Sequence, residues 1–502
     1  MEIRLNKLAA KIDQAIDDRN LNDLIQYLEK IELLKAKENS KLDIAHLHFF
    51  SANCYSAMRS LKKDINDWAW ENSNLEKEIY YLRLAFSECN EVLFEQDLSD
   101  LRFRIGTNLA NALNHVGRSV EAIEIWDNVI NSCPKFSMAI GNRGYCLSWY
   151  ANYLYDLGHQ PLFFYESYIA IKKALEIGVE PHAAKEMEVW LEHLEEITNW
   201  DKFNFKPKPE SKGRSKLERK YRNWCLQNRL FLNPLNDILK DDFVANDVLT
   251  FPSVRVSVEK SSPSPPEVYG IYNQLKQEYV SARYMLFEAI EDSEKNIHFS
   301  DKRVLLYDML DYRYYRLWIE KLKMSFLSTY TIFDKIGYLI NEYWELNLSV
   351  QKIKFNTVWF DKADKRRCLH ERFKLSDNWP LRGLFWVSKD LYFLNDDEQT
   401  IEPDARHLNH IRNHIAHKYL KVYDDVLVDV KSMRNRKGYK LSYPISEIEL
   451  KNQTLKLLKL VRSALIYVSL AAHSEESKLK DESEGGFVGE MPLFEVGDKY
   501  RL

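Results

Sequence analysis

Residues 103–136 read FRIGTNLANALNHVGRSVEAIEIWDNVINSCPKF. The small side chains of Ala110 and Ala122 would allow two helices to pack closely against each other. Gly117 can form the turn between these helices, and Pro134 can end the second one. The stretch therefore predicts an antiparallel pair of helices as the building unit of the N-terminal part.

This unit resembles a tetratricopeptide-like (TPR-like) repeat, whose period is about 34 residues. A second unit is expected from Ser137, with Gly144 in the small position and a second helix over 163–177 that Gly178 ends. Weaker amphipathic spacing marks helices at 2–17, 20–36, 40–60 and 75–96. We therefore predict a TPR-like helical-repeat domain at 1–200, with a plain all-α bundle as the alternative.

The composition indicates a globular, mainly helical protein. Hydrophobic residues make up 45% and charged residues 29% of the 502-residue chain, with only 15 glycines and 14 prolines. The formal net charge of −4 excludes a polycation, so any nucleic-acid contact must come from a local basic patch. The six cysteines form no CxxC pair, which argues against a zinc ribbon or a disulfide framework. The length predicts two or three domains.

Several other classes of protein lack sequence support. The first residues contain no apolar core of signal-peptide length, and no apolar run approaches the roughly 20 residues that span a bilayer. We therefore expect no membrane segment and a cytoplasmic location. No Walker-type loop, Rossmann glycine set or Gly-x-Ser-x-Gly turn occurs, so nucleotide hydrolysis and α/β-hydrolase chemistry are not indicated.

Residues 201–266 are predicted to be a linker followed by a packing arm. The prolines, glycine and lysines of 201–216 are typical of a solvated connector, although their positive charge could also contact a phosphate backbone. Residues 221–239 are aromatic and polar, and we expect an extended arm that packs on the following domain. The run SSPSPP at 261–266 marks the next boundary.

Four long amphipathic stretches after this boundary predict a C-terminal helical bundle. They span 267–293, 315–346, 404–424 and 446–473. The domain is expected at 267–473, with an insertion at 348–403 that is rich in charged and aromatic residues. Residues 474–502 are acidic and contain glycine, so we expect a flexible tail.

The third of these stretches carries the groups with the most chemistry, in the run RNHIAHKY at 412–419. Arg412 is a permanent cation that can bind phosphate oxygens through two N–H groups. His414 and His417 can transfer protons near neutral pH. On one helix Asn413 and His417 would share a face, whereas Arg412 would lie about 140° from His417. A second copy of the helix could bring these groups together, as metal-free cleavage of an RNA phosphodiester requires.

The C-terminal half resembles the HEPN superfamily (higher eukaryote and prokaryote nucleotide-binding domains) over about 267–473. Arg412, Asn413 and His417 match its Arg-x4–6-His motif with a polar residue after the arginine. Further stretches support the resemblance: WCLQN at 224–228, LFLNPLN at 230–236, EYVSAR at 278–283, FDKI at 333–336, LRGLFW at 381–386 and LNHIRNHIAHKY at 408–419. The chain is most similar to the bacterial subgroup that joins N-terminal helical repeats to a C-terminal HEPN domain.

The resemblance implies a metal-independent, cofactor-free endoribonuclease that works as a homodimer. The RNA 2′-hydroxyl would attack the adjacent phosphate and give a 2′,3′-cyclic phosphate and a 5′-hydroxyl. His417 would act as base, and His414 or the second copy's His417 as acid. Arg412 would stabilise the charge on the phosphoryl oxygens, and Asn413 would orient the imidazole or the phosphate. Bacterial relatives suggest a toxin or phage-defence effector whose repeats restrain it or sense a protein partner.

Other interpretations stay open. The protein could be a non-catalytic TPR/HEPN scaffold that binds protein or nucleotide. Tyr419 extends the match to a toxin-type Arg-x4-His-x-Tyr motif and is a candidate for modification by a nucleotidyltransferase antitoxin, although it could simply pack. His407, His410, His414 and His417 could bind a metal, but zinc sites usually add cysteine or carboxylate ligands. Asp334 and Lys335 could line the cleft or form structural ion pairs, and Glu278 and Arg283 are expected to be structural.

Overall fold

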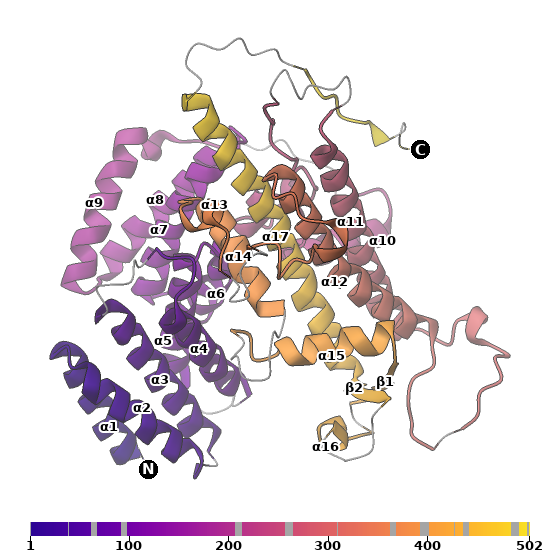
Figure 1. The fold of residues 1–502 in the computed structure, drawn as a ribbon, viewed down its shortest axis with the longest axis horizontal. Helices are drawn as coiled ribbons and strands as arrows, with labels where there is room; N and C mark the ends of the chain where they lie inside the picture. The colour runs from indigo at the N-terminus through magenta and orange to yellow at the C-terminus, as the bar shows by residue number, and fades with distance from the viewer. Residues whose placement is uncertain are drawn as a thin grey trace.

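The computed structural model describes residues 2–38, 40–61, 68–91, 98–205, 213–256, 265–308, 310–361, 368–391, 401–425, 427–434, 441–482, 491–498 and 501. Helices α1 to α9 form one side of the molecule, and α10, α11 and α12 lie on the other side (Figure 1). Helices α14 and α17 run between these two sides (Figure 1). Within the described ranges the sheet structure is one parallel pair of short strands, so the prediction of an all-α fold is confirmed.

The N-terminal part is a series of helices in which neighbours in sequence pack together. Their bounds are α1 Glu2–Asp17, α2 Leu21–Lys35, α3 Lys41–Leu61, α4 Ser73–Glu91, α5 Leu98–His115, α6 Ser119–Ser132, α7 Ser137–Tyr153, α8 Gln160–Ile177 and α9 Pro181–Ile197. The sequence predicted α1 to α8 to within about five residues where it gave their bounds, whereas it placed no helix at α9.

The predicted roles of the small residues are confirmed. Gly117 adopts a φ of +89° between α5 and α6, a left-handed conformation that favours glycine. Ala110 and Ala122 are fully buried where these helices meet. A Cβ atom on Gly144 would lie 2.8 Å from a side-chain carbon of Ile171, so glycine lets α7 and α8 approach each other. Gly178, with a φ of +100°, ends α8.

The segment after the repeats is partly helical. It contains α10 Lys216–Gln227 and the short 3-10 helices η1 Trp200–Lys202, η2 Pro234–Asp237 and η3 Asp242–Val244. The expectation of an extended arm at 221–239 is therefore wrong for 221–227, which continue α10. The part of the predicted linker at 206–212 lies outside the described residues. We call residues 228–250 the packing arm.

Two buried arginines hold the packing arm against the C-terminal helices. Arg283 of α11 (Glu267–Ser293) donates two hydrogen bonds of 2.8 Å to the Asp247 carboxylate and one of 2.7 Å to the carbonyl of Leu230. Arg462 of α17 (Glu447–Glu482) donates to Asp237 at 2.6 Å. Each guanidinium is thus paired and fully engaged, as burial requires. The expected structural role of Arg283 is confirmed.

The C-terminal helices begin close to the predicted positions but end differently. Their bounds are α11 as above, α12 Leu317–Tyr343, α13 Glu371–Lys374, α14 Trp379–Leu391, α15 Ala405–Ala416, α16 Val430–Arg434 and α17 as above, with 3-10 helices η5 Phe299–Asp301 and η6 Val350–Lys352. Strands β1 Tyr419–Tyr423 and β2 Ser442–Ser446 pair in parallel, with Tyr419 opposite Ser442. Helix α17 continues to Glu482, beyond the expected start of the tail at 474.

Helix α14 lies within the region 348–403 that the sequence predicted to be an insertion, and it is a central packing element. All its residues except Lys389 are buried. Its backbone meets the repeats directly: a Cβ atom on Gly383 would lie 2.2 Å from the carbonyl oxygen of Gly117. The Trp379 indole N–H donates to the carbonyl of Asn114 at 3.0 Å, and Arg382 donates to the carbonyl of His115 at 2.9 Å.

The far end of α14 carries a buried carboxylate that two helices of the repeats share. Arg83 of α4 donates to both oxygens of Asp390, at 2.7 and 2.9 Å, and Arg118 before α6 donates to it at 2.5 Å. Burial alone would raise the pKa of Asp390, but Arg118 and Arg83 hold this pKa below its ordinary value. The repeats and the C-terminal helices therefore form one packed structure.

Among the helices of the described residues, none combines the length and the apolar character that a membrane span requires.

We predict that Gly383→Ala destabilises the protein strongly. The new methyl group would overlap the backbone of Gly117, so α14 and the repeats must separate. Thermal unfolding followed by circular dichroism should show a melting temperature several degrees below that of the parent, for a loss of about 2–3 kcal/mol. Gly270→Ala in α11 is the matched control.

A Cβ atom on Gly270 meets nothing within 4 Å, so this control should keep or slightly raise the melting temperature. Equal effects of the two substitutions would contradict the close approach of α14 to the repeats.

Candidate functional site

Helix α15 presents its apolar side to α12 and α14. Ala405, Leu408, Ile411 and His414 follow at three-residue steps and are buried, which fixes the face that points inward. The helix begins at Ala405, one residue after the predicted start at 404, with Asp404 as its N-cap residue. Lys456 of α17 donates to Glu402 at 3.0 Å and to Asp404 at 3.3 Å beside this end of the helix.

The predicted helix at 404–424 is too long, because α15 ends at Ala416. His417 is the C-cap residue, and its backbone N–H donates to the carbonyl of Asn413 at 3.0 Å. From Tyr419 the chain forms β1, whose backbone pairs with β2 and in which Leu420 and Val422 are buried while Tyr419 is exposed. The run YLKVY has high strand propensity, so pairing with β2 is favoured over continuation of the helix.

Arg412 and Asn413 lie in the last part of α15 and interact with each other. Arg412 Nη1 donates to Asn413 Oδ1 at 2.9 Å, and Asn413 Nδ2 donates to Asn409 Oδ1 at 3.2 Å. The Arg412 guanidinium lies 5.8 Å from the ring centroid of Tyr330 in α12. Its Nε is buried and has no acceptor among the described residues. A buried donor without a partner is costly, and an anion beside it would remove that cost.

His417 is exposed, and the following Lys418 and Tyr419 are exposed too. Tyr419 therefore does not pack into the core, and its phenol is accessible to other molecules. The structure brings Arg412 and Asn413 into direct contact and places His417 at the end of the same helix, on the solvent side. The sequence analysis expected Tyr419 on that helix, but in the structure Tyr419 begins β1.

His414 belongs to a different group of side chains, gathered around Tyr443 of β2. The ring of Tyr443 stacks on His410 at a centroid distance of 5.4 Å and contacts His414, also at 5.4 Å, and His407 at 5.6 Å. His414 Nδ1 lies 2.7 Å from the carbonyl oxygen of His410. Since a carbonyl can only accept, this nitrogen carries the proton in that hydrogen bond. Burial and the neighbouring His414 lower the pKa of His410.

His407 connects the group around Tyr443 to a carboxylate at the start of α17. His407 Nδ1 lies 2.6 Å from the hydroxyl of Tyr443, and its Nε2 lies 3.0 Å from Glu449 Oε1. Arg434 of α16 donates to both oxygens of Glu449, one of them at 2.9 Å. Burial would raise the pKa of Glu449, but hydrogen bonds from His407 and Arg434 lower it to about 2. These contacts fix the orientation of α15 relative to β2 and α17.

Sequence reasoning did not find Tyr443, Glu449, Arg434 or Tyr330. They come from three other helices and a strand, so no local spacing connects them to α15. The one available signal is the alternation in LSYPIS at 441–446 just before the last helix, which is typical of a short strand.

The other residues named from the sequence have structural partners. Lys335 forms an ion pair with Glu278 of α11, the interpretation that the sequence analysis allowed for it. Glu278 therefore joins α11 to α12. Three of the four histidines that were considered for metal binding surround Tyr443 instead. Within the part of the chain that the structure describes, no cluster of three or more His, Cys, Asp or Glu side chains could hold a metal ion.

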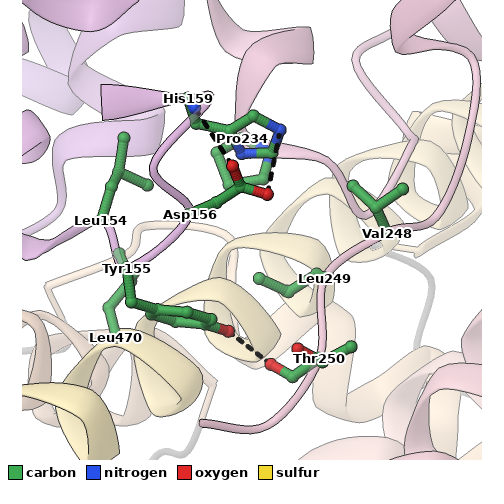
Figure 2. Close-up of a pocket in the computed structure, with 9 residues that line it drawn as sticks. All are labelled: Leu154, Tyr155, Asp156, His159, Pro234, Val248, Leu249, Thr250 and Leu470. Atoms are coloured by element: carbon green, nitrogen blue, oxygen red, sulfur yellow. Dashed lines mark hydrogen bonds and ion pairs between the residues drawn. The ribbon is translucent and has the colours of Figure 1, made fainter. Parts of the chain in front are cut away.

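Two cavities occur away from the end of α15. Figure 2 shows the smaller, about 210 Å³, lined by Leu154, Tyr155, Asp156, His159, Pro234, Val248, Leu249, Thr250 and Leu470. In it His159 Nε2 lies 3.7 Å from Asp156, burial lowers the pKa of His159, and the Tyr155 hydroxyl donates to the Thr250 carbonyl. This cavity separates the loop before α8 from the packing arm (Figure 2).

The larger cavity, about 400 Å³, lies where the repeats meet α14, α15 and α17. Its lining includes Leu408 of α15 and the charged side chains around Asp390. Neither of these two cavities is lined by Arg412 or His417.

Comparison with known proteins gives one match. The family model described as LA2681-like HEPN matches residues 259–475. Neither a curated protein nor a solved structure shows a significant match. The matched range contains α11, α12, α14, α15, both strands and most of α17, which are the elements that build the site.

We predict that Glu449→Gln lowers the free energy of unfolding at neutral pH, and that this effect becomes smaller as the pH falls below 4.5. The pKa of Glu449 falls from an ordinary 4.5 to about 2 in the folded protein, so its charge stabilises the fold above pH 4.5, and this contribution is lost as pH falls towards 2. At pH 7 the loss should be about 1–2 kcal/mol, allowing for partial exposure of the pair to solvent. Melting temperatures of parent and variant, measured from pH 8 to pH 3, should differ by a constant amount above pH 4.5 and should approach each other as the pH falls from 4.5 to 3. A difference that stays constant over the whole range would contradict the assignment.

Proposed function

From the premise that residues 259–475 form a HEPN domain, we propose that the protein is an endoribonuclease whose reactive groups are Arg412 and His417. The domain match supports HEPN-type function, and the arrangement at the end of α15 supports the nuclease. The observation that carries the proposal is the buried Nε of Arg412, which has no acceptor among the described residues, on the same helix whose C-cap residue is the solvent-exposed His417. A permanent cation with one unused N–H donor and an accessible imidazole near the same helix end are groups that can act on a phosphodiester.

The reaction would use the substrate's own nucleophile. His417 would take the proton of the RNA 2′-hydroxyl, whose oxygen attacks the adjacent phosphorus. The bond to the 5′-oxygen breaks, and a second imidazole would give that oxygen a proton. Arg412 would stabilise the charge that grows on the phosphoryl oxygens, and Asn413, which already binds Arg412, would hold the guanidinium in place. The products are a 2′,3′-cyclic phosphate and a 5′-hydroxyl, and the reaction uses no metal or cofactor.

One chain supplies one exposed imidazole at this helix end, so the reaction needs another acid. His414 is buried, and its Nδ1 is engaged by the backbone, which leaves only Nε2 for proton transfer. We therefore propose a homodimer in which His417 of each copy serves the other copy's cleft, with His414 as the second choice for the acid.

The repeats are proposed to regulate this activity. Asp390 joins α4 and α6 of the repeats to α14, and Glu402, which lies 3.4 Å from Arg83, precedes α15. A protein partner that moved α4 or α6 would therefore act on the start of α15. A regulated RNA-cleaving effector of this kind fits a toxin or a phage-defence protein, with Tyr419 accessible to a modifying antitoxin.

A non-catalytic scaffold is the alternative function. The observation that favours it is the dense structural use of His407, His410 and His414, which pack around Tyr443. If His417 had no chemical role, the domain would serve as a rigid support for the repeats and would bind protein or nucleotide.

We predict that Arg412→Ala and His417→Ala each lower RNA cleavage at least about 100-fold, because they remove charge stabilisation and proton transfer respectively. Purified protein is incubated with total RNA in EDTA, and fragments are analysed for 2′,3′-cyclic phosphate ends. His182→Ala on α9, an exposed histidine far along the chain, is the matched control and should cut like the parent.

Cleavage by both variants at the parental rate would refute the site. If the parent and all variants leave the RNA intact, and the parent retains a stable protein partner in pull-downs, the scaffold function is favoured.

A further inference from the structure

The exposed tyrosines lie in two segments, and one of these segments directly follows α15. Among the tyrosines that the structure describes, the exposed ones are Tyr307, Tyr312, Tyr315 and Tyr419, with exposed fractions of 85%, 72%, 44% and 40%. Three of them lie in the loop between α11 and α12, and the fourth begins β1. Among the tyrosines that the structure describes, exposure is thus confined to these two segments, which points to a binding function there.

The loop between α11 and α12 is fixed to β1 where it carries these tyrosines. Arg313 forms an antiparallel bridge with Tyr423, and the Tyr314 N–H donates to the carbonyl of Val422 at 2.9 Å. The Tyr314 hydroxyl also donates to Asp424 at 2.6 Å. Tyr312 and Tyr315 are therefore held beside the strand that starts with Tyr419.

A guanidinium joins two of the exposed rings. Arg313 lies 4.8 Å from the ring centroid of Tyr315 and 5.1 Å from that of Tyr419. Lys421 Nζ lies 5.7 Å from the Tyr419 ring. Asp311 forms ion pairs of 3.2 Å with Arg313 and 3.5 Å with Lys421, so it holds both cations in position. The result is a fixed surface of tyrosines interleaved with cations, which we call the tyrosine platform: Tyr312, Arg313, Tyr315, Tyr419 and Lys421.

The platform begins two residues after His417, and the intervening Lys418 is exposed. We propose that the tyrosine platform binds single-stranded RNA by stacking bases on its rings, next to the helix end that carries the reactive groups. This inference rests on the proposed nuclease function and identifies the form of RNA that the site receives. Unpaired bases have free faces for aromatic side chains, whereas the bases of a duplex are stacked on one another.

The chemistry of the platform favours RNA over a second protein chain. Aromatic rings with nearby lysine and arginine are the combination that contacts bases and phosphates together. The same loop also exposes the aliphatic side chains of Val304, Leu305, Leu306 and Leu310, which would suit a second copy of the chain. That copy is the competing occupant, and the experiment separates the two.

The test measures binding of a fluorescein-labelled oligouridylate to the full-length His417→Ala variant by fluorescence anisotropy. In this background, Tyr312→Ala with Tyr315→Ala should weaken binding about tenfold for each ring removed. Tyr312→Phe with Tyr315→Phe keeps both rings and should bind like the His417→Ala parent. The matched control is Phe494→Ala, which removes an exposed aromatic ring near the C-terminus that is not part of the platform.

Equal affinity of the alanine and phenylalanine variants for the oligouridylate would overturn the proposal. So would equal weakening for a duplex RNA, since stacking on the platform requires unpaired bases. A change from dimer to monomer in light scattering, with unchanged RNA affinity, would assign the surface to a second copy. The nuclease proposal fails separately, if Arg412→Ala and His417→Ala cut RNA like the parent, and the binding result stands in that case.

Discussion

The shared carboxylate of Asp390 is the interaction on which the arrangement of the molecule depends. A buried carboxylate between two arginines is stable only while both donors stay in place, since loss of either leaves buried charge without full compensation. Arg83 and Arg118 come from the repeats, whereas Asp390 comes from the C-terminal part. The two parts are therefore joined by geometry that tolerates little sliding, and the close contact of Gly117 with Gly383 adds a steric limit to the same interface.

The packing arm is held against α11 and α17 by paired buried charges as well. Arg462 and Arg283 each bind an aspartate of the arm as well as backbone carbonyls, which converts an irregular segment into part of the core. Irregular backbone is costly to bury because its polar groups need partners, and these arginines provide them. As a result, α11 and α17 form a firm base for α12 and α15, and the groups at the end of α15 are carried by a rigid support.

Local sequence patterns predicted the helix pairs, because Gly117, Ala110 and Gly144 act through neighbours close in the chain. They also located Arg412 and Asn413 on one helix. Patterns of this kind did not predict the end of α15. The helix ends where β1 begins, and β1 depends on pairing with β2, which follows only after the intervening helix α16. The central position of α14 was missed for a similar reason: its partners Arg83 and Arg118 are remote in sequence, and the charged segments around it look like a surface region.

The joint between α15 and β1 has a consequence for how the sequence can change. Side chains of a strand alternate between its two faces, and β1 pairs with β2 in one register, with Leu420 opposite Tyr443. Insertion or deletion of one residue at Lys418 would turn Leu420 and Val422 outward and would draw Tyr419 into the interior. Length variation is therefore expected to be tolerated in the connection between the two strands but excluded from the few residues that separate His417 from β1.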